Sequence, residues 1–106
     1  MSKFLLRASY TAAGAAGVLK DGGSGRAAAV EALVASVGGT VESMYWALGS
    51  DDFFMIADLP DAAAAAAASL TVGASGAARV ETTPLLSAAD VDAAIKRRAD
   101  YRAPGS

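Results

Sequence analysis

Apolar and aromatic residues gather in two runs within the segment 41–58, which reads VESMYWALGSDDFFMIAD. Two runs rich in β-branched and aromatic residues flank Gly49-Ser50-Asp51-Asp52, whose glycine and aspartates favour a turn. The pattern predicts a β-hairpin. Because successive side chains of a strand point to opposite faces, the first strand is expected to be apolar on both. One face would carry Met44, Trp46 and Leu48, and the other Val41, Tyr45 and Ala47.

The second hairpin strand is also apolar on both faces, with Phe53, Met55 and Ala57 on one and Phe54 and Ile56 on the other. A sheet in a small α+β domain usually packs one face against helices and exposes a polar face to water. A second apolar face therefore needs a second cover. In a chain of 106 residues, the simplest cover is another subunit, so the pattern predicts a homodimer or higher homo-oligomer.

Residues before the hairpin predict one strand and a broken helix. Residues 3–10 form the strand, with Phe4, Leu6, Ala8 and Tyr10 on its core face. Thr11 is the expected N-cap of a helix over residues 12–20, which Asp21-Gly22-Gly23 interrupts. Helix resumes after Ser24 and ends at Gly38-Gly39. Its buried stripe is Val30, Leu33, Val34 and Val37.

Residues after the hairpin predict a helix, a strand and a last short helix. Pro60 suits the first turn of a helix that contains the alanine run 62–68 and ends at residues 73–76, and Asp58 is a candidate cap. Residues 77–83 form a strand that stops before Pro84. The spacing of Ser87 and Asp90 predicts a capping box for the last helix.

The predicted order is strand, helix, strand, strand, helix, strand, helix, which is the ferredoxin-like βαββαβ pattern with an extra C-terminal helix. We therefore expect an α+β fold that pairs as a dimeric α/β barrel. Residues 1–98 form the single domain, and residues 99–106 are expected to be a flexible tail.

Composition excludes several classes of function. The formal net charge is −2 and the chain has neither histidine nor cysteine. Cysteine and serine–histidine nucleophiles, disulfides, structural zinc and histidine-ligated haem are therefore excluded. The scattered basic residues do not favour nucleic acid. No apolar leader or spanning segment is evident, so we expect a cytoplasmic protein with no membrane partner. No glycine-rich phosphate loop of defined spacing occurs either, and we expect no metal, haem or flavin cofactor.

Polar residues inside the predicted strands are candidate site residues, because a charged group there must be paired or hydrated. They are Arg7, Ser9, Glu42 and Arg79. One interpretation is an ion-pair network between Glu42 and an arginine at the sheet edge or subunit interface. The other is a cleft between helices and sheet that binds an anionic or enolic ligand. The ligand-binding candidates are then Arg7, Ser9, Tyr45, Trp46 and Arg79.

A second candidate lies in the break of the first helix. Ser24, Gly25 and Arg26 precede a helical segment whose free N–H groups suit a phosphate or carboxylate. The spacing matches neither a P-loop nor GxGxxG, and a simple break capped by Ser24 is the competing interpretation. Asp51, Asp52 and Asp58 are too few and too widely spaced for a calcium loop. We interpret them as turn and cap residues.

Several short segments resemble the GYD domain family. They are SYTAAG (9–14), VLKDGG (18–23), VGGTVES (37–43), DLPD (58–61) and TTPLL (82–86). The family takes its name from a glycine-tyrosine-aspartate signature in the hairpin. This chain has Gly49-Ser50-Asp51-Asp52 there, without the tyrosine. The resemblance implies the fold of dimeric α/β-barrel proteins and implies no particular biochemical function.

Three hypotheses for function follow. The first is a non-catalytic oligomeric module that binds a small organic ligand between sheet and helices. The second is a cofactor-free enzyme of the monooxygenase or isomerase type, which would rely on Tyr10, Tyr45, Arg7 or a carboxylate as acid or base. The third is a structural subunit of a larger assembly.

Overall fold

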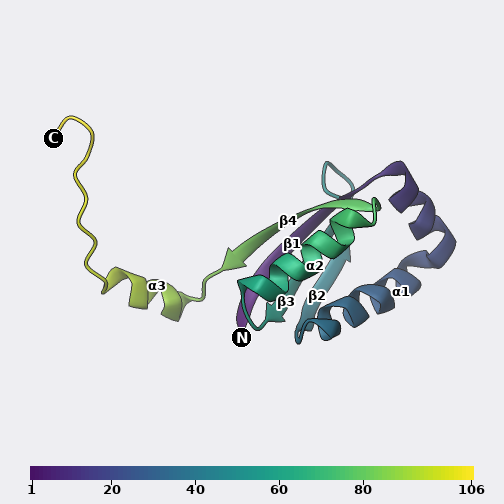
Figure 1. Cartoon of the computed structure of the whole chain (residues 1–106), viewed down its shortest axis with the longest axis horizontal. Coiled ribbons are helices and arrows are strands. Elements are labelled where there is room, and N and C mark those ends of the chain that lie inside the picture. The colour runs from purple at the N-terminus through teal and green to yellow at the C-terminus, as the bar shows by residue number, and fades with distance from the viewer.

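The computed structural model describes all 106 residues and contains one four-stranded sheet with three helices. In chain order the elements are β1 (Ser2–Tyr10), α1 (Ala12–Ser36), β2 (Thr40–Trp46), β3 (Phe53–Leu59), α2 (Ala62–Ala74), β4 (Ala78–Leu85) and α3 (Ala88–Ile95). The strands are antiparallel in the order β2-β3-β1-β4. This order confirms the predicted α+β, ferredoxin-like arrangement. We call the face packed against α1 and α2 the helix face and the opposite one the open face (Figure 1).

The core lies between the helix face and the two long helices. Alternate residues of the two central strands are buried there, as the alternation predicted for β1, and apolar residues of both helices and of β4 pack beside them. The set is Phe4, Leu6, Ala8, Phe53, Met55, Ala57, Leu59, Val34, Ala65 and Ala78. Alanine side chains let α2 approach the sheet closely, which explains the use of an alanine run in this helix.

The faces of β2 differ from the prediction. A β-bulge between Val41 and Ser43 shifts the pairing with β3 by one residue. Because an extra residue reverses the alternation, both Val41 and Met44 pack against the core. Leu48 lies beyond the end of the strand and is fully exposed. The predicted assignment of Val41 and Leu48 to faces was therefore wrong.

The first helix is bent, as predicted. Gly22 has φ 75° and ψ 168°, a conformation that only glycine adopts without strain, and helix resumes immediately after it. Thr11 caps the first limb by accepting a hydrogen bond from Gly14 N. Its hydroxyl also lies 2.7 Å from Gly76 O, which fastens this limb to the turn before β4. The second limb carries Val34 into the core.

Two predicted boundaries change in the second half. Asp61, not Asp58, caps α2, because its side chain accepts from Ala64 N. Strand β4 continues through Pro84, which lies opposite Phe4. Proline is tolerated there because β4 is an edge strand.

The C-terminal region extends away from the sheet and helices (Figure 1). The predicted capping box of α3 is present, since Ser87 and Asp90 each accept from the other's backbone N–H. No residue of α3 is buried. Residues 99–106 contain no helix or strand. None of the helices combines the length and the apolarity that crossing a membrane requires.

Candidate functional site

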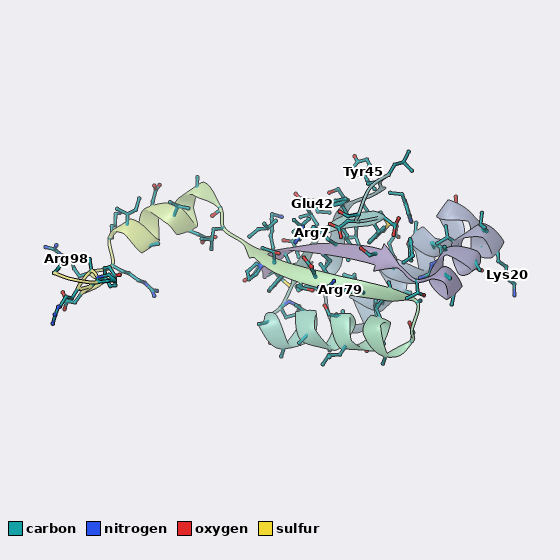
Figure 2. The ribbon with its side chains drawn as sticks, turned by 90° about the horizontal axis from the view of Figure 1, so that it is seen from above. Arg7, Lys20, Glu42, Tyr45, Arg79 and Arg98 are labelled. Carbon is teal, nitrogen blue, oxygen red and sulfur yellow. The ribbon has the colours of Figure 1, made fainter.

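The predicted site residues divide between the two faces of the sheet. Figure 2 shows Arg7, Glu42 and Tyr45 on the side of the sheet opposite α2. Arg79 pairs with Ser9 across β4 and β1 and joins the same set of ion pairs as Arg7. Arg7, Ser9 and Arg79 therefore do not line a cleft between helices and sheet, and that placement was wrong. The cause is the alternation of side chains along β1, which puts its apolar residues toward the helices and its polar residues on the open face.

A polar hollow of about 320 Å³ lies on the open face where the hairpin loop meets β1 and β4. Its lining contains no apolar side chain and consists of Arg7, Ser9, Ser50, Asp51, Arg79 and Glu81. Arg7 donates to Glu81 and lies 3.5 Å from Asp51. The Ser9 hydroxyl donates to Ser50 O at 2.7 Å. Two cations face two carboxylates, so the hollow is close to neutral and already largely hydrogen-bonded within the chain.

Two groups of this hollow are not fully paired with other groups of the chain. The Nε of Arg7 is buried without a hydrogen-bond partner. Arg79 is 82% exposed and makes one contact of 3.5 Å with Glu81. Only Arg79 can therefore offer its guanidinium to a group that covers the open face, because the buried Nε of Arg7 is out of reach of such a group.

One interpretation of the sequence expected Glu42 to pair with an arginine. In the structure its partner is a lysine. Lys3 Nζ lies 3.3 Å from Glu42 and 3.0 Å from Asp58. These hydrogen bonds, above all the one to Asp58, raise the pKa of Lys3. The arginines Arg7 and Arg79 pair with Asp51 and Glu81 instead. The polar residues of the strands thus form two exposed ion-pair clusters at opposite ends of the open face.

The cleft between helices and sheet exists, but other residues line it. It is an apolar cavity of about 90 Å³ bounded by the sheet, the second limb of α1 and α2. Thirteen of its fifteen lining residues are hydrophobic, and the other two are Arg26 and Ser69. Tyr10, at the end of β1, is the only lining residue that combines a ring with a hydroxyl group. The Ser69 hydroxyl bonds to Thr82 at 2.6 Å.

Trp46 belongs to the helix face and is separated from Arg7 and Tyr45. Its ring meets Phe53 edge to face, with 5.1 Å between centroids. Its Nε1 donates to the Tyr10 hydroxyl at 3.1 Å. Tyr45 lies on the open face beside Phe54 and is 70% exposed. The aromatic residues of the hairpin therefore lie on both faces of the sheet and do not form a single ligand-binding surface.

The helix-break candidates behave differently from one another. Ser24 and Gly25 are exposed, and the Ser24 hydroxyl makes no hydrogen bond within the chain, so Ser24 is not a cap. Gly22 alone produces the bend, which leaves a cap unnecessary. Arg26 lies on the second limb, lines the apolar cavity and makes one long contact of 3.7 Å with Asp21. It is the only charged residue in that lining.

The sequence did not point to Ser69 as a lining residue, and it placed Tyr10 on the core face and among the possible acids or bases, but not among the ligand-binding candidates. Tyr10 carried a usable signal, because it is the last member of the predicted core face and the only one with a hydroxyl. Ser69 gave a weaker signal as the first polar residue after the alanine run. Nothing in the spacing indicated that Arg26 would reach the core side of the kinked helix. No three carboxylates come together as metal ligands.

Comparison with known proteins identifies the family. The profile of the GYD domain matches residues 4–95, which include every strand and helix except the first two residues of β1, Ser2 and Lys3. No curated protein and no solved structure matches the chain. The match covers nearly the whole chain, and the chain belongs to the GYD domain family.

Proposed function

We propose that the chain is a non-catalytic, self-associating module that binds a small organic ligand in the apolar cavity between its sheet and helices. The observation that carries the proposal is the cavity of about 90 Å³, apolar except for Arg26 and Ser69. Ligand sites are typically concave and mostly apolar, with a few polar groups that fix orientation. The cavity has this composition, although its volume is small.

The size and charge of the cavity limit the chemistry of its ligand. An apolar cavity of roughly 150 Å³ holds benzene, so a volume of about 90 Å³ suits a short branched chain better than a ring. A larger ligand would need α1 and α2 to part, and these helices hardly contact each other. Arg26 would pair with a carboxylate, because its present contact with Asp21 is long and single. The favoured ligand is a small carboxylic acid with an apolar end.

The scarcity of general acid–base groups in the lining, where the Tyr10 hydroxyl is the main one, supports a binding role over catalysis. The cavity is lined by no carboxylate, amine, imidazole or thiol. A cofactor-free enzyme would have to move a proton with the Tyr10 hydroxyl, which accepts a hydrogen bond from Trp46. Turnover that disappears in Tyr10→Phe would favour the enzyme over the module.

Self-association is supported by the open face. Leu5, Phe54 and Ile56 lie side by side on it and are only half buried, with no helix over them. A second copy stacked on this face would remove the three side chains from water, which stabilises by about 25 cal/mol per Å² buried. Two ferredoxin-like units joined in this way form the dimeric α/β barrel expected from the sequence.

Ligand binding is tested by thermal shift and NMR titration with isobutyrate, benzoate and the uncharged isobutyramide. We expect isobutyrate to raise the melting temperature and to shift signals of cavity residues, and isobutyramide to do so less. Arg26→Gln should remove the preference for the acid. Lys20→Gln, which removes an exposed cation from the same helix, should keep it.

A cavity-filling pair locates the site. Ala29 lines the cavity and its neighbour Ala28 does not. Ala29→Phe should abolish the response to isobutyrate, whereas Ala28→Phe should leave it intact. Equal responses in all four variants, or no response in the unmodified chain to any of the three compounds, would contradict the proposal.

A further inference from the structure

The C-terminal arm, residues 86–106, has the surface of a segment that packs on something. Leu86 is 69%, Val91 43% and Ile95 75% exposed. Val91 and Ile95 stand one turn apart on the same side of α3. An isolated helix of eight residues is not stable in water, and tertiary packing of an apolar side normally stabilises it. The arm's own subunit does not supply that packing, because none of its residues is buried.

The charges of the arm differ from those of the rest of the chain. Four cations are held in ion pairs within the body of the protein, namely Lys3, Arg7, Arg26 and Arg79. Five of the nine cations make no ion pair, and apart from Lys20 they all lie in the arm: Lys96, Arg97, Arg98 and Arg102. Lys96, Arg97 and Arg98 thus follow directly on the arm's apolar side chains, and Asp90, Asp92 and Asp100 are its carboxylates. An acidic surface with apolar residues beside it would complement both features.

The outer edge of β2 provides such a surface. A hollow of about 660 Å³, here the β2-edge hollow, lies between α1 and the first half of β2. Its lining combines apolar residues with two carboxylates and contains no cation. The lining is Glu31, Ala32, Ala35, Gly39, Thr40, Val41, Glu42, Ser43 and Met44. Glu31 makes no ion pair within the chain, whereas Glu42 already has one, with Lys3 at 3.3 Å.

Sheet geometry brings the two features together in a dimer. β4 and β2 are the opposite edges of the sheet. The end of β4 and the start of β2 lie at the same end, because Leu85 pairs with Lys3, Lys3 with Asp58, and Asp58 with Thr40. A two-fold axis parallel to the strands stacks two open faces, exchanges the edges and keeps the strand direction. β4 of one copy then lies over β2 of the other, and the arm leaves beside the partner's β2-edge hollow.

We propose that the C-terminal arm of each subunit docks in the β2-edge hollow of a second copy of this chain. Val91 and Ile95 pack on Ala32, Ala35 and Met44 of the partner subunit. Lys96, Arg97 and Arg98 pair with Glu31 and Glu42 of the partner subunit. The arm exchange rests on the proposed self-association through the open face and makes the dimer interface larger than the sheets alone. Figure 1 shows the arm extending away from the sheet and from α1 and α2 of its own chain.

Spin labels can show which chain the arm contacts. The chain has no cysteine, so Ala93→Cys takes a single label on the side of α3 away from Val91 and Ile95. Chains that carry the spin label and have natural isotope abundance are mixed and equilibrated with ¹⁵N-enriched chains that carry no spin label. We expect broadening of the amides of residues 31–44 in the ¹⁵N chain. A label at Lys20→Cys, on the exposed bend of α1, should leave these amides sharp.

Two results would overturn the proposal. One is broadening confined to the labelled chain itself, measured with ¹⁵N spin-labelled chains diluted in excess natural-abundance chains. The other is the absence of broadening in a chain that sediments as a dimer. A chain that sediments as a monomer would instead contradict the self-association on which the proposal rests, so the two failures are distinguishable.

Charge reversal gives a second readout on the same contact. The triple variant Lys96→Glu, Arg97→Glu, Arg98→Glu should raise the dimer dissociation constant about three- to tenfold, as expected for exposed ion pairs. Adding Glu31→Lys should restore part of the affinity, whereas Lys20→Glu alone should change nothing. An unchanged dissociation constant in the triple variant, measured by sedimentation at low salt, would contradict the contact.

Discussion

Gly14 lies where the first limb of α1 crosses the turn before β4. A Cβ atom at this position would overlap the backbone oxygen of Ala77 and approach the Tyr10 ring to 3.1 Å. The backbone oxygen cannot move aside without disturbing the start of β4, because Thr11 N also donates to it. The close approach therefore requires glycine.

Gly14→Ala should lower the free energy of unfolding by about 1–3 kcal/mol, the usual cost of overpacking a tight site. Gly17 is a matched control in the same limb, since a Cβ there would meet no atom within 4 Å. Gly17→Ala should leave stability unchanged or raise it by up to about 1 kcal/mol, because alanine is the better helix former. Urea unfolding measures both. Equal losses in the two variants would show that the contact with Ala77 is not the cause.

Short helix α3 depends on its capping box. The backbone N–H and hydroxyl of Ser87 hold the pKa of Asp90 below its ordinary value of 3.8. A carboxyl group with a lowered pKa in the folded state stabilises that state above its ordinary pKa. This stabilisation is lost as the pH falls from that value through the lowered one. Acid should therefore loosen α3 before it affects the sheet.

We expect amide signals of residues 88–95 to lose helical character below about pH 4, while amides of β1 and β3 stay unchanged there. Asp90→Asn keeps an acceptor at the same position but cannot take up a proton, so α3 in this variant should show little change over the same range. NMR spectra across a pH titration test this. The same midpoint in both chains would mean that a group other than Asp90 controls the helix.

Most elements could be predicted from the sequence, because local chemistry sets them. The alternation of β1 and β3, the glycines at the bend of α1 and the Ser87–Asp90 spacing each act within a few residues. The β-bulge at Val41 could not be predicted, since it depends on how β2 pairs with β3. Asp58 was the predicted cap of α2, but it lies within β3 and pairs with Lys3, and Asp61 directly before the helix is the cap.

The positions of the candidate site residues could not be predicted from the alternation within single strands. They depend on which face of the sheet packs against the helices and on the bend of α1. The hairpin residues are apolar on both faces, so the pattern alone could not say which face meets the helices. Trp46 went to the helix face and Tyr45 to the open face, which separated the predicted ligand set. Arg26 reaches the cavity because of a three-dimensional bend at Gly22, and only the folded chain shows this.

The whole molecule has two partly covered apolar regions, the cavity behind the sheet and the open face in front of it. A single layer of helices covers the first only. On the open face the two ion-pair clusters, around Lys3 and around Arg7, flank the apolar group of Leu5, Phe54 and Ile56. Apolar centres with polar surroundings are common in protein interfaces. This arrangement fits a face that meets a second copy.

A charge placed at the centre of this face tests the assembly directly. Ile56 lies between Leu5 and Ser43 on the open face and is half buried in the single subunit. In a face-to-face dimer Ile56→Asp would bury a carboxylate without a partner, which costs several kcal/mol. We expect the dimer to dissociate at micromolar concentration while the subunit stays folded, because the open face is not part of the core.

Leu70→Asp is the control, since Leu70 is 72% exposed on the other side of the molecule. Sedimentation should give a monomer for Ile56→Asp and a dimer for Leu70→Asp and the unmodified chain. A folded dimer that persists in Ile56→Asp would place the subunit contact elsewhere than on the open face.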